Sequence, residues 1–306
     1  QLDITLIMQK WEKQQRMLLT NMNNLSARYK YIIGFLGLLL ILLFIFKYYS
    51  ESKSNLPSTY FIYTNTELKP LAGLSSTTVV SLNSLQRWDQ TAFNLVKDNK
   101  LGDAYAARIY AALYVAQRDA TFLSEKIKHR PIGSLDPISS KVLCLFFPGN
   151  CLDLQKFNVT DSYSEALANI VFSKINAKIA LDNNAKPYPE KKAAQYWAGT
   201  RPYFAQEVGS WNPWFLTQGS EFRVPPPPDY NSSEWNKQLN AVKKALANIS
   251  PSQIRSVVVW AGNPGTVTPP GIWLDIVNDY LWSHSISLNK ILMVRSVLAM
   301  GIEDSL

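Results

Sequence analysis

The chain has few of the residues that most often carry catalysis or bind metals. Its 306 residues include two histidines, His129 and His284, far apart in the sequence. We find no metal-binding motif around either one, and we expect both at the surface or in packing positions. The sequence also contains no G-x-S-x-G, G-x-G-x-x-G, H-E-x-x-H or P-loop motif. These absences argue against serine hydrolases, dinucleotide-binding domains, zinc proteases and P-loop NTPases.

Paired carboxylates are another source of acid–base chemistry. Asp182 with Glu190, and Glu303 with Asp304, could form such pairs, but the sequence does not distinguish them from solvated helix ends. We therefore expect them to be solvated. Tryptophans either line a ligand cleft or fill the core, and their helical and loop-to-helix spacing favours the core. The tryptophans concerned are Trp197, Trp211, Trp214, Trp260 and Trp273.

Cysteine is also scarce. Only Cys144 and Cys151 occur, with six residues including a Pro-Gly bend between them. In an oxidising compartment, this spacing permits a disulfide that closes a small loop. Two buried thiols are the alternative, and the sequence leaves both interpretations open.

Basic residues exceed acidic ones, 31 to 23, which gives a formal net charge of +8. Lysine and arginine are spread along the chain, and no basic run alternates with aromatic residues as a nucleic-acid-binding face requires. We therefore expect no nucleic-acid partner.

One long apolar run lies near the N-terminus. Residues 31–46 contain no charged or strongly polar residue, and Tyr48 and Tyr49 beside Lys47 extend the run to about the length of a bilayer core. This predicts a single transmembrane helix over residues 31–49. A cleaved signal peptide is the alternative, but the run is long, no small-residue cleavage site follows it, and thirty residues precede it.

The charges around this run predict its orientation. Five basic residues precede it, whereas only Lys53 and Lys69 follow it closely. By the positive-inside rule, the N-terminus is cytoplasmic and the body is extracytoplasmic, in the periplasm if the source is bacterial. The preceding basic residues are Lys10, Lys13, Arg16, Arg28 and Lys30.

Residues 1–30 form a predicted cytoplasmic amphipathic segment. Its apolar residues fall near one helical stripe, with basic residues between them. Residues 1–25 could therefore pair with a partner helix or lie on the membrane, and a marginal juxtamembrane helix is an equal alternative. The stripe consists of Ile4, Met8, Trp11, Leu18, Met22 and Leu25.

The rest of the chain divides into a linker and irregular segment over residues 50–83 and a helical bundle over residues 84–306. Helical periodicity is clear from Ser84, with a break at Asp98-Asn99, and an alanine-rich interior helix follows. No alternation of strands and helices occurs. The fold class is therefore all-α, a helical bundle behind a single N-terminal transmembrane helix.

Two capping boxes predict further helix starts. Ser162 with Glu165 begins a helix that runs to about Leu181, and Ser250 with Gln253 begins another. Apolar periodicity predicts helices over residues 233–247, 271–282 and 288–301, with Trp260 and Trp273 on core-facing stripes. The proline run of residues 225–228 favours an extended strut on the surface.

The C-terminal third carries an ordered series of motifs. A tryptophan-containing stretch leads to a Phe-Arg pair and a proline run. A helix follows with Gln seven residues before Trp, then Thr-Pro-Pro-Gly-x-Trp, and finally an apolar stretch that ends near Asp. This order resembles the vanadium-dependent haloperoxidase branch of the type-2 phosphatidic acid phosphatase superfamily. The residues are Trp211, Trp214, Phe222, Arg223, Pro225, Pro226, Gln253, Trp260, Pro269, Pro270, Gly271, Trp273 and Asp304.

The chain departs from the family pattern at two places. Val224 follows Arg223, and Ile249-Ser250 stands where the family more often has Arg-Thr. Both are scaffold positions, so they bear on the subgroup more than on membership. Residues 106–108 and 116–120 look like the first bundle helix of the same branch.

The resemblance implies a division between scaffold and active site. In this superfamily, a lysine, two arginines, a glycine-containing loop and two histidines hold a phosphate or vanadate oxyanion. Their Lys…Arg-Pro, Pro-Ser-Gly-His and Arg…His blocks follow the helix that ends here at Leu306, and we find no counterpart in this chain. The resemblance therefore implies no catalytic, cofactor-binding or metal-binding residue in these 306 residues.

Two interpretations remain open. In the first, the chain is the scaffold part of a membrane-anchored phosphatase or haloperoxidase that binds phosphate or vanadate through a further C-terminal part. In the second, the chain is complete and serves as a non-catalytic structural or interaction subunit of a membrane assembly. In either case, we expect the 306 residues alone to be inactive.

Overall fold

The computed structural model describes residues 58–157, 161–187, 196 and 204–306. These residues form helices and no β-strand, which confirms the all-α fold class. The principal helices are α3 (Asn65–Leu68), α4 (Leu82–Asp98), α5 (Asp103–Lys128), α6 (Asp136–Phe146), α7 (Cys151–Gln155), α8 (Ser162–Ala180), α9 (Ser233–Ala247), α10 (Pro251–Ala261), α11 (Thr268–Ser283) and α12 (Leu288–Asp304).

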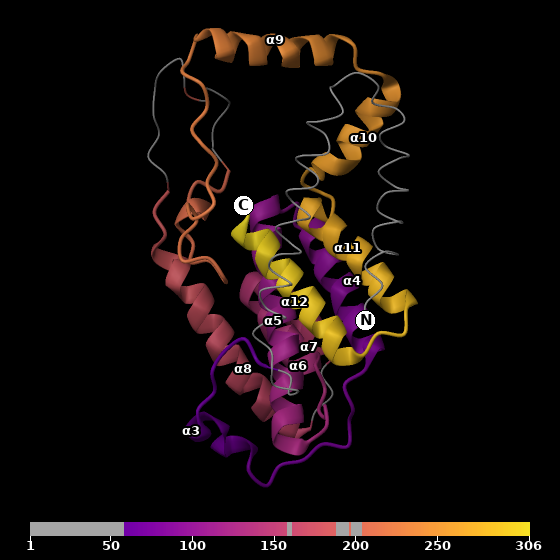
Figure 1. Cartoon of the computed structure of the whole chain (residues 1–306). Helices are drawn as coiled ribbons and strands as arrows, with labels where there is room; N and C mark the ends of the chain where they lie inside the picture. Colours follow the sequence, from indigo (N-terminus) through magenta and orange to yellow (C-terminus); the bar gives the residue numbers. More distant parts are fainter. Residues whose placement is uncertain (1–57, 158–160, 188–195, 197–203) are drawn as a thin grey trace.

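Helix α5 forms the centre of the bundle. Its 26 residues are buried almost continuously from Ala104 to Ser124. Helices α6, α8, α11 and α12 all pack against it, as Figure 1 shows. Small alanine side chains let these neighbours approach closely, so the alanine-rich composition explains the central position of α5.

Several predicted helix boundaries are confirmed. The break after α4 lies at Asn99, and the capping box of Ser250 and Gln253 begins α10. The predicted box of Ser162 and Glu165 is wrong by one residue. Asp161 is the N-cap of α8, and its carboxylate accepts from the backbone N–H of Ser164. Asp and Ser are both good N-caps, so the sequence allowed either register.

The segment before α4 is more ordered than predicted. A capping box of Thr64 and Glu67 begins α3, and a 3₁₀ turn, η1 (Lys69–Leu71), follows it. Leu71 is buried in the core. Residues 65–71 are thus helical within a segment expected to be mostly irregular. A four-residue helix is too short to give a periodic signal.

Helices α9 and α10 form where predicted but lie apart from the core. Neither helix buries a residue. In Figure 1, α9 crosses above the bundle and α10 leads back down to α11. The rings of Trp260 and Trp273 are half-buried and lie against one another, with centroids 5.6 Å apart. The expectation that both rings face the core was therefore wrong.

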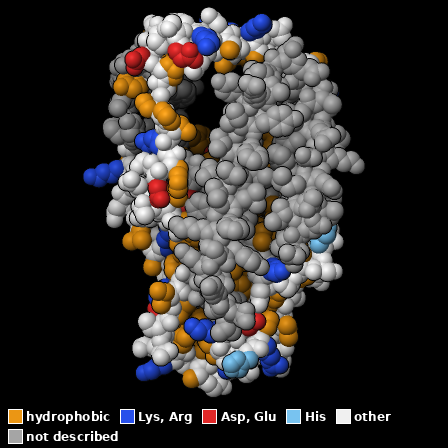
Figure 2. Space-filling model, viewed as in Figure 1, with side chains coloured by type: hydrophobic (Ala, Val, Ile, Leu, Met, Phe, Trp, Pro, Cys, Tyr) orange, Lys and Arg blue, Asp and Glu red, His pale blue; other side chains and the backbone are white. Residues whose placement is uncertain are grey.

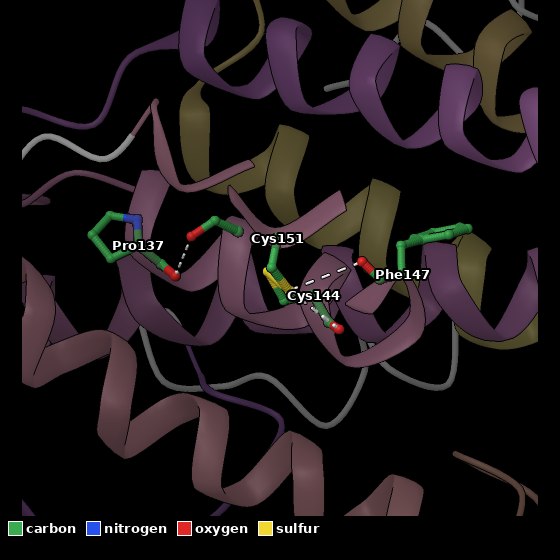
Figure 3. Close-up of a disulfide and its surroundings, with 5 residues drawn as sticks. Pro137, Cys144, Phe147 and Cys151 are labelled. Atoms are coloured by element: carbon green, nitrogen blue, oxygen red, sulfur yellow. Dashed lines mark hydrogen bonds between the residues drawn. A yellow bond between two sulfur atoms is a disulfide. The ribbon is translucent and has the colours of Figure 1, made fainter. Parts of the chain in front are cut away.

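Cys144 and Cys151 are joined by a disulfide, with their Cα atoms 5.0 Å apart (Figure 3). The bond connects α6 to the first residue of α7 across a 3₁₀ turn, η2 (Pro148–Asn150). That turn contains the Pro-Gly bend noted in the sequence.

No helix of residues 58–306 that the structure describes is long and apolar enough to cross a bilayer. The predicted transmembrane helix over 31–49 and the amphipathic segment over 1–30 lie outside the described residues. So do Glu190 and the predicted start of the linker.

Candidate functional site

A buried ion pair lies between α4 and α12. Arg295 donates to Asp89, and both side chains are almost completely buried. Arg295 also donates to the side-chain oxygen of Asn278 at 3.1 Å, and its guanidinium lies 4.0 Å from the ring centroid of Tyr114. Four helices, α4, α5, α11 and α12, therefore meet at one polar cluster.

Burial dominates the electrostatics of this cluster. Desolvation raises the pKa of Asp89 to about 6, although Arg295 and the hydroxyl of Tyr114 favour its charged form. Asn278 donates to Asp89 at 3.0 Å and to Tyr114 at 3.1 Å. Every charged group of the cluster therefore has a partner within the fold, as buried charges require.

A second carboxylate, Asp119 of α5, holds the start of the described chain. It accepts from the backbone N–H groups of Tyr60 at 2.5 Å and Phe61 at 2.9 Å, and from the hydroxyl of Tyr63 at 2.9 Å. Desolvation raises the pKa of Asp119 to about 6, against the opposing effect of these donors. We call residues 60–67 the first clasp.

A similar arrangement occurs at the end of α12. Asp304 accepts from the backbone N–H groups of Trp214 and Phe215, both at 2.7 Å, and of Leu216 at 3.2 Å. Glu303 accepts from the indole N–H of Trp214. We call residues 214–221 the second clasp.

The two clasps are alike in detail. In the first, the backbone N–H and hydroxyl of Thr64 donate to Glu67 at 2.8 and 2.9 Å. In the second, those of Thr217 donate to Glu221 at 2.7 and 3.0 Å. The clasps also touch, because the hydroxyl of Tyr60 donates to the Trp214 carbonyl at 2.6 Å. Both clasps thus combine an aromatic pair held by a helix carboxylate with a Thr…Glu contact, although Thr and Glu are three residues apart in the first and four in the second.

The expectation that Glu303 and Asp304 form a solvated helix end was wrong. Desolvation raises the pKa of Glu303 to about 7 and raises that of Asp304 as well. Lys178 of α8 lies near both, and desolvation lowers its pKa. The ammonium of Lys178 donates to the Asn212 carbonyl.

Asp182 is also buried rather than solvated. Its carboxylate pairs with Arg108 at 2.8 Å and accepts from the backbone N–H of Asn212 at 2.7 Å. The guanidinium of Arg108 lies 4.3 Å from the ring centroid of Trp211. Trp211 and Trp214, two residues of the tryptophan lead-in, therefore fasten the segment before the prolines to the bundle.

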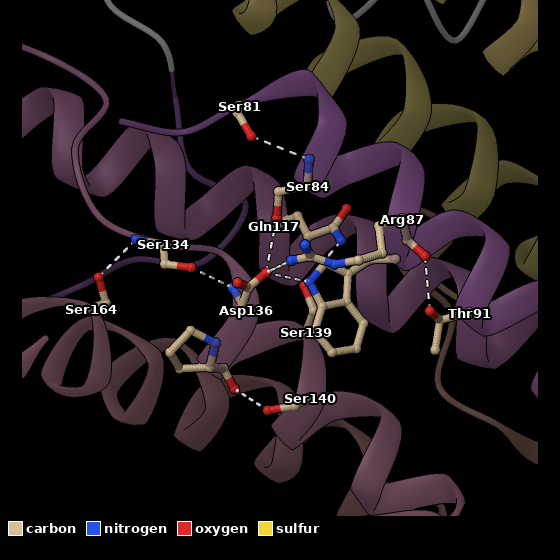
Figure 4. A network of polar contacts seen from close by, with 12 residues as sticks. Ser81, Ser84, Arg87, Thr91, Gln117, Ser134, Asp136, Ser139, Ser140 and Ser164 are labelled. Atoms are coloured by element: carbon tan, nitrogen blue, oxygen red, sulfur yellow. Dashed lines mark hydrogen bonds and ion pairs between the residues drawn. The ribbon is translucent and has the colours of Figure 1, made fainter. Parts of the chain in front are cut away.

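A further network joins α4 to α6 (Figure 4). Asp136 accepts from Arg87, from the indole N–H of Trp88 at 2.7 Å and from the hydroxyl of Ser84 at 3.0 Å. Trp88 is completely buried. This cluster fixes the packing of α4 against α6.

The two histidines lie apart at helix ends. His129 adopts a left-handed conformation as the C-cap of α5. His284 follows α11 and stacks on Tyr280, with ring centroids 4.1 Å apart. The structure does not bring them together, and the described residues contain no group of three or more side chains suited to a metal ion.

The remaining motif residues lie on the surface or against neighbouring turns. Phe222 is exposed in a turn, and Arg223, Pro225 and Pro226 are exposed in the irregular stretch after it, so the proline run lies on the surface as predicted. Gln253 completes the cap of α10, while Pro270 and Gly271 are buried at the start of α11, next to half-buried Pro269.

A depression between α3 and α8 is lined by Glu67, Pro70, Asn169 and Ser173, among others. Its one ionised group, Glu67, already pairs with Lys174 at 2.5 Å. The charged group of this depression is therefore already paired within the fold.

Comparison with known proteins gives no relative. No family model matches the chain, and neither a curated protein nor a solved structure matches it.

Proposed function

We propose that this chain is the membrane-anchored, extracytoplasmic scaffold part of a protein of the vanadium haloperoxidase and type-2 phosphatidic acid phosphatase type. The scaffold positions helices and extended segments, and the oxyanion-binding groups come from outside these residues. Anchoring is assigned to residues 31–49, with the N-terminus in the cytoplasm.

The observation that carries this proposal is that the buried arginines of the bundle contact groups of the fold itself. Arg108, Arg118 and Arg295 are the buried cations of the described bundle, and each contacts groups of the fold. An oxyanion site needs several cationic or N–H donors aimed at one empty position. These arginines instead face Asp182, Ser58 and Asp89, respectively.

Under this proposal, the chain itself binds no cofactor. Vanadate or phosphate would be bound only where the family's Lys, Arg-Pro and Pro-Ser-Gly-His motifs are supplied. The clasped segment before the proline run, residues 211–221, supports the scaffold role because it contacts α5, α8 and α12.

A non-catalytic interaction subunit is the second candidate. The specific observation in its favour is the apolar surface of α9 and α10, with side chains such as Leu246 at 63% exposure. A surface of this kind is typical of a binding face.

Activity measurements on the purified chain test the proposal. We expect no hydrolysis of p-nitrophenyl phosphate, no peroxide-dependent bromination and no heat of binding with orthovanadate. A variant with His129→Ala and His284→Ala serves as the matched control. Activity in the parent that disappears in this variant would overturn the scaffold assignment.

A further inference from the structure

Helix α9 carries an apolar stripe that the bundle does not cover. Trp235, Leu239, Val242 and Leu246 recur at the spacing of one helix face. Val242 is 57% exposed and Leu246 is 63% exposed. A stripe of this kind normally faces a core, so its exposure indicates a surface that contacts something else.

Helix α10, which follows α9 in the chain, also exposes apolar side chains. Ile254, Val257 and Val258 are spaced along one side and are 47%, 56% and 61% exposed, respectively. We call residues 231–261, which contain both helices, the arm. In Figure 1, α9 lies beyond the end of the bundle, and α10 returns to it at α11.

The charge of the arm is strongly one-sided. The arm contains four basic residues and one acidic residue, which gives a net charge of 4 − 1 = +3. The acidic residue, Glu234, lies 3.6 Å from Lys237 and accepts from Gln238. Basic side chains appear along the upper edge of Figure 2, where Figure 1 places α9. The basic residues are Lys237, Lys243, Lys244 and Arg255.

We propose that the arm binds an anionic lipid surface. The apolar stripe enters the boundary between headgroups and acyl chains, while the lysines contact lipid phosphates. Tyr230 and Trp235 have ring centroids 5.0 Å apart at the start of α9, and such amphipathic rings favour the membrane interface.

This inference rests on the proposed anchor, which would raise the effective concentration of lipid at the arm. A weak intrinsic affinity would then suffice. A second copy of the chain is less favoured as the occupant, because two arms of charge +3 repel each other. An acidic protein partner remains an outcome that the experiment below separates.

The test places the full chain in lipid nanodiscs. One set contains phosphatidylcholine alone, and the other contains phosphatidylcholine mixed with phosphatidylglycerol. Hydrogen exchange of the α9 backbone amides is then followed by mass spectrometry. We expect slower exchange in the anionic discs, roughly tenfold or more, and loss of this protection at high salt.

Two double variants provide a matched comparison. Lys243→Gln with Lys244→Gln removes two charges from the arm, and Lys97→Gln with Lys100→Gln removes two exposed charges from the end of α4. Only the first should abolish the protection in anionic discs. Val242→Ser with Leu246→Ser should weaken it as well, because the apolar stripe would be lost.

The contrary outcomes are distinct. Equal exchange in both kinds of disc overturns the proposal, as does protection that both lysine variants retain. Protection that grows with protein concentration would assign the surface to a second copy. Protection that appears only after an acidic protein is added would assign it to that partner.

Failure of the anchor is detected separately. Size-exclusion chromatography shows whether the chain stays with the disc, and deletion of residues 31–49 should release it. If the chain never enters the disc, the same exchange measurement on added vesicles of the two compositions still tests the arm.

Discussion

Glu303 is buried near the ammonium of Lys178 and accepts from the indole N–H of Trp214, and both of these groups favour its charged form. Because desolvation outweighs these, its pKa rises from 4.5 to about 7 in the folded protein. The folded state therefore holds this proton more tightly than the unfolded state does. The stabilisation is complete below the ordinary pKa of a glutamate and is lost as the pH rises through about 7.

The first prediction follows from this proton. The free energy of unfolding should fall between pH 4.5 and about 7 by on the order of 3 kcal/mol on account of Glu303. Glu303→Gln keeps the acceptor for Trp214 and should remove the upper part of this dependence. Urea denaturation over a pH series measures the free energy of unfolding of both proteins. An unchanged pH profile in the variant would contradict the assignment.

Asp89 gives a second prediction at the same scale. Asp89→Ala leaves Arg295 buried without its carboxylate and should cost roughly 3 to 5 kcal/mol of unfolding free energy. Lys156→Ala breaks the exposed pair with Asp153, whose side chains are 72% and 74% exposed, and should cost at most about 1 kcal/mol. Equal losses in the two variants would show that the core pair is not buried in solution.

Among the elements, the turn between α10 and α11 depends on one glycine. Gly262 is the C-cap of α10 in a left-handed conformation, and a Cβ added there would lie 2.5 Å from Pro269 Cδ and 2.7 Å from its backbone nitrogen. The third prediction is that Gly262→Ala destabilises the protein by more than about 1 kcal/mol.

Gly73 is the matched control for this glycine. It also has a positive φ, but nothing lies within 4 Å of an added Cβ. Gly73→Ala should therefore cost only the strain of the left-handed conformation, about 1 kcal/mol. Thermal unfolding compares the two, and a smaller loss at Gly262 would argue against the close contact with Pro269.

Periodicity and capping predicted most of the bundle helices. The starts of α4 and α10 and the buried, alanine-rich α5 follow from local signals. The exposure of α9 did not, because periodicity identifies an apolar stripe without showing what covers it. The clasps were missed for a related reason, since most of their donors to Asp119 and Asp304 are backbone N–H groups that leave no side-chain pattern.

The buried carboxylates were missed because partners lie far away in the sequence. The sequence around Asp182 suggests a polar helix end, and only the structure shows that Arg108 of α5 pairs with it. The Thr…Glu turns at Thr64 and Thr217 are the one local signal that could have identified the clasps. They are short, and the spacing of Thr64 and Glu67 occurs widely at helix starts.

For the whole molecule, the fourth prediction concerns topology. Protease added outside sealed spheroplasts should digest the body after residue 50 and spare residues 1–30, because the basic residues precede the apolar run. Leu40→Arg should impair insertion by roughly 2.5 to 3.5 kcal/mol. Protection of the body from protease would show the opposite orientation. Release of the unmodified chain from membranes by alkaline carbonate would argue against the anchor itself.

The pairing of Asp89 with Arg295 spans 206 residues of sequence. During synthesis, α4 and α5 emerge long before α12, so the centre of the bundle cannot complete its ion pair until nearly all of these residues have been made. Contacts of such high sequence separation close slowly, because the entropy of the long loop is lost first. Until α12 has been made, Asp89 lacks its arginine partner, and this interval is when we expect a chaperone to be most needed.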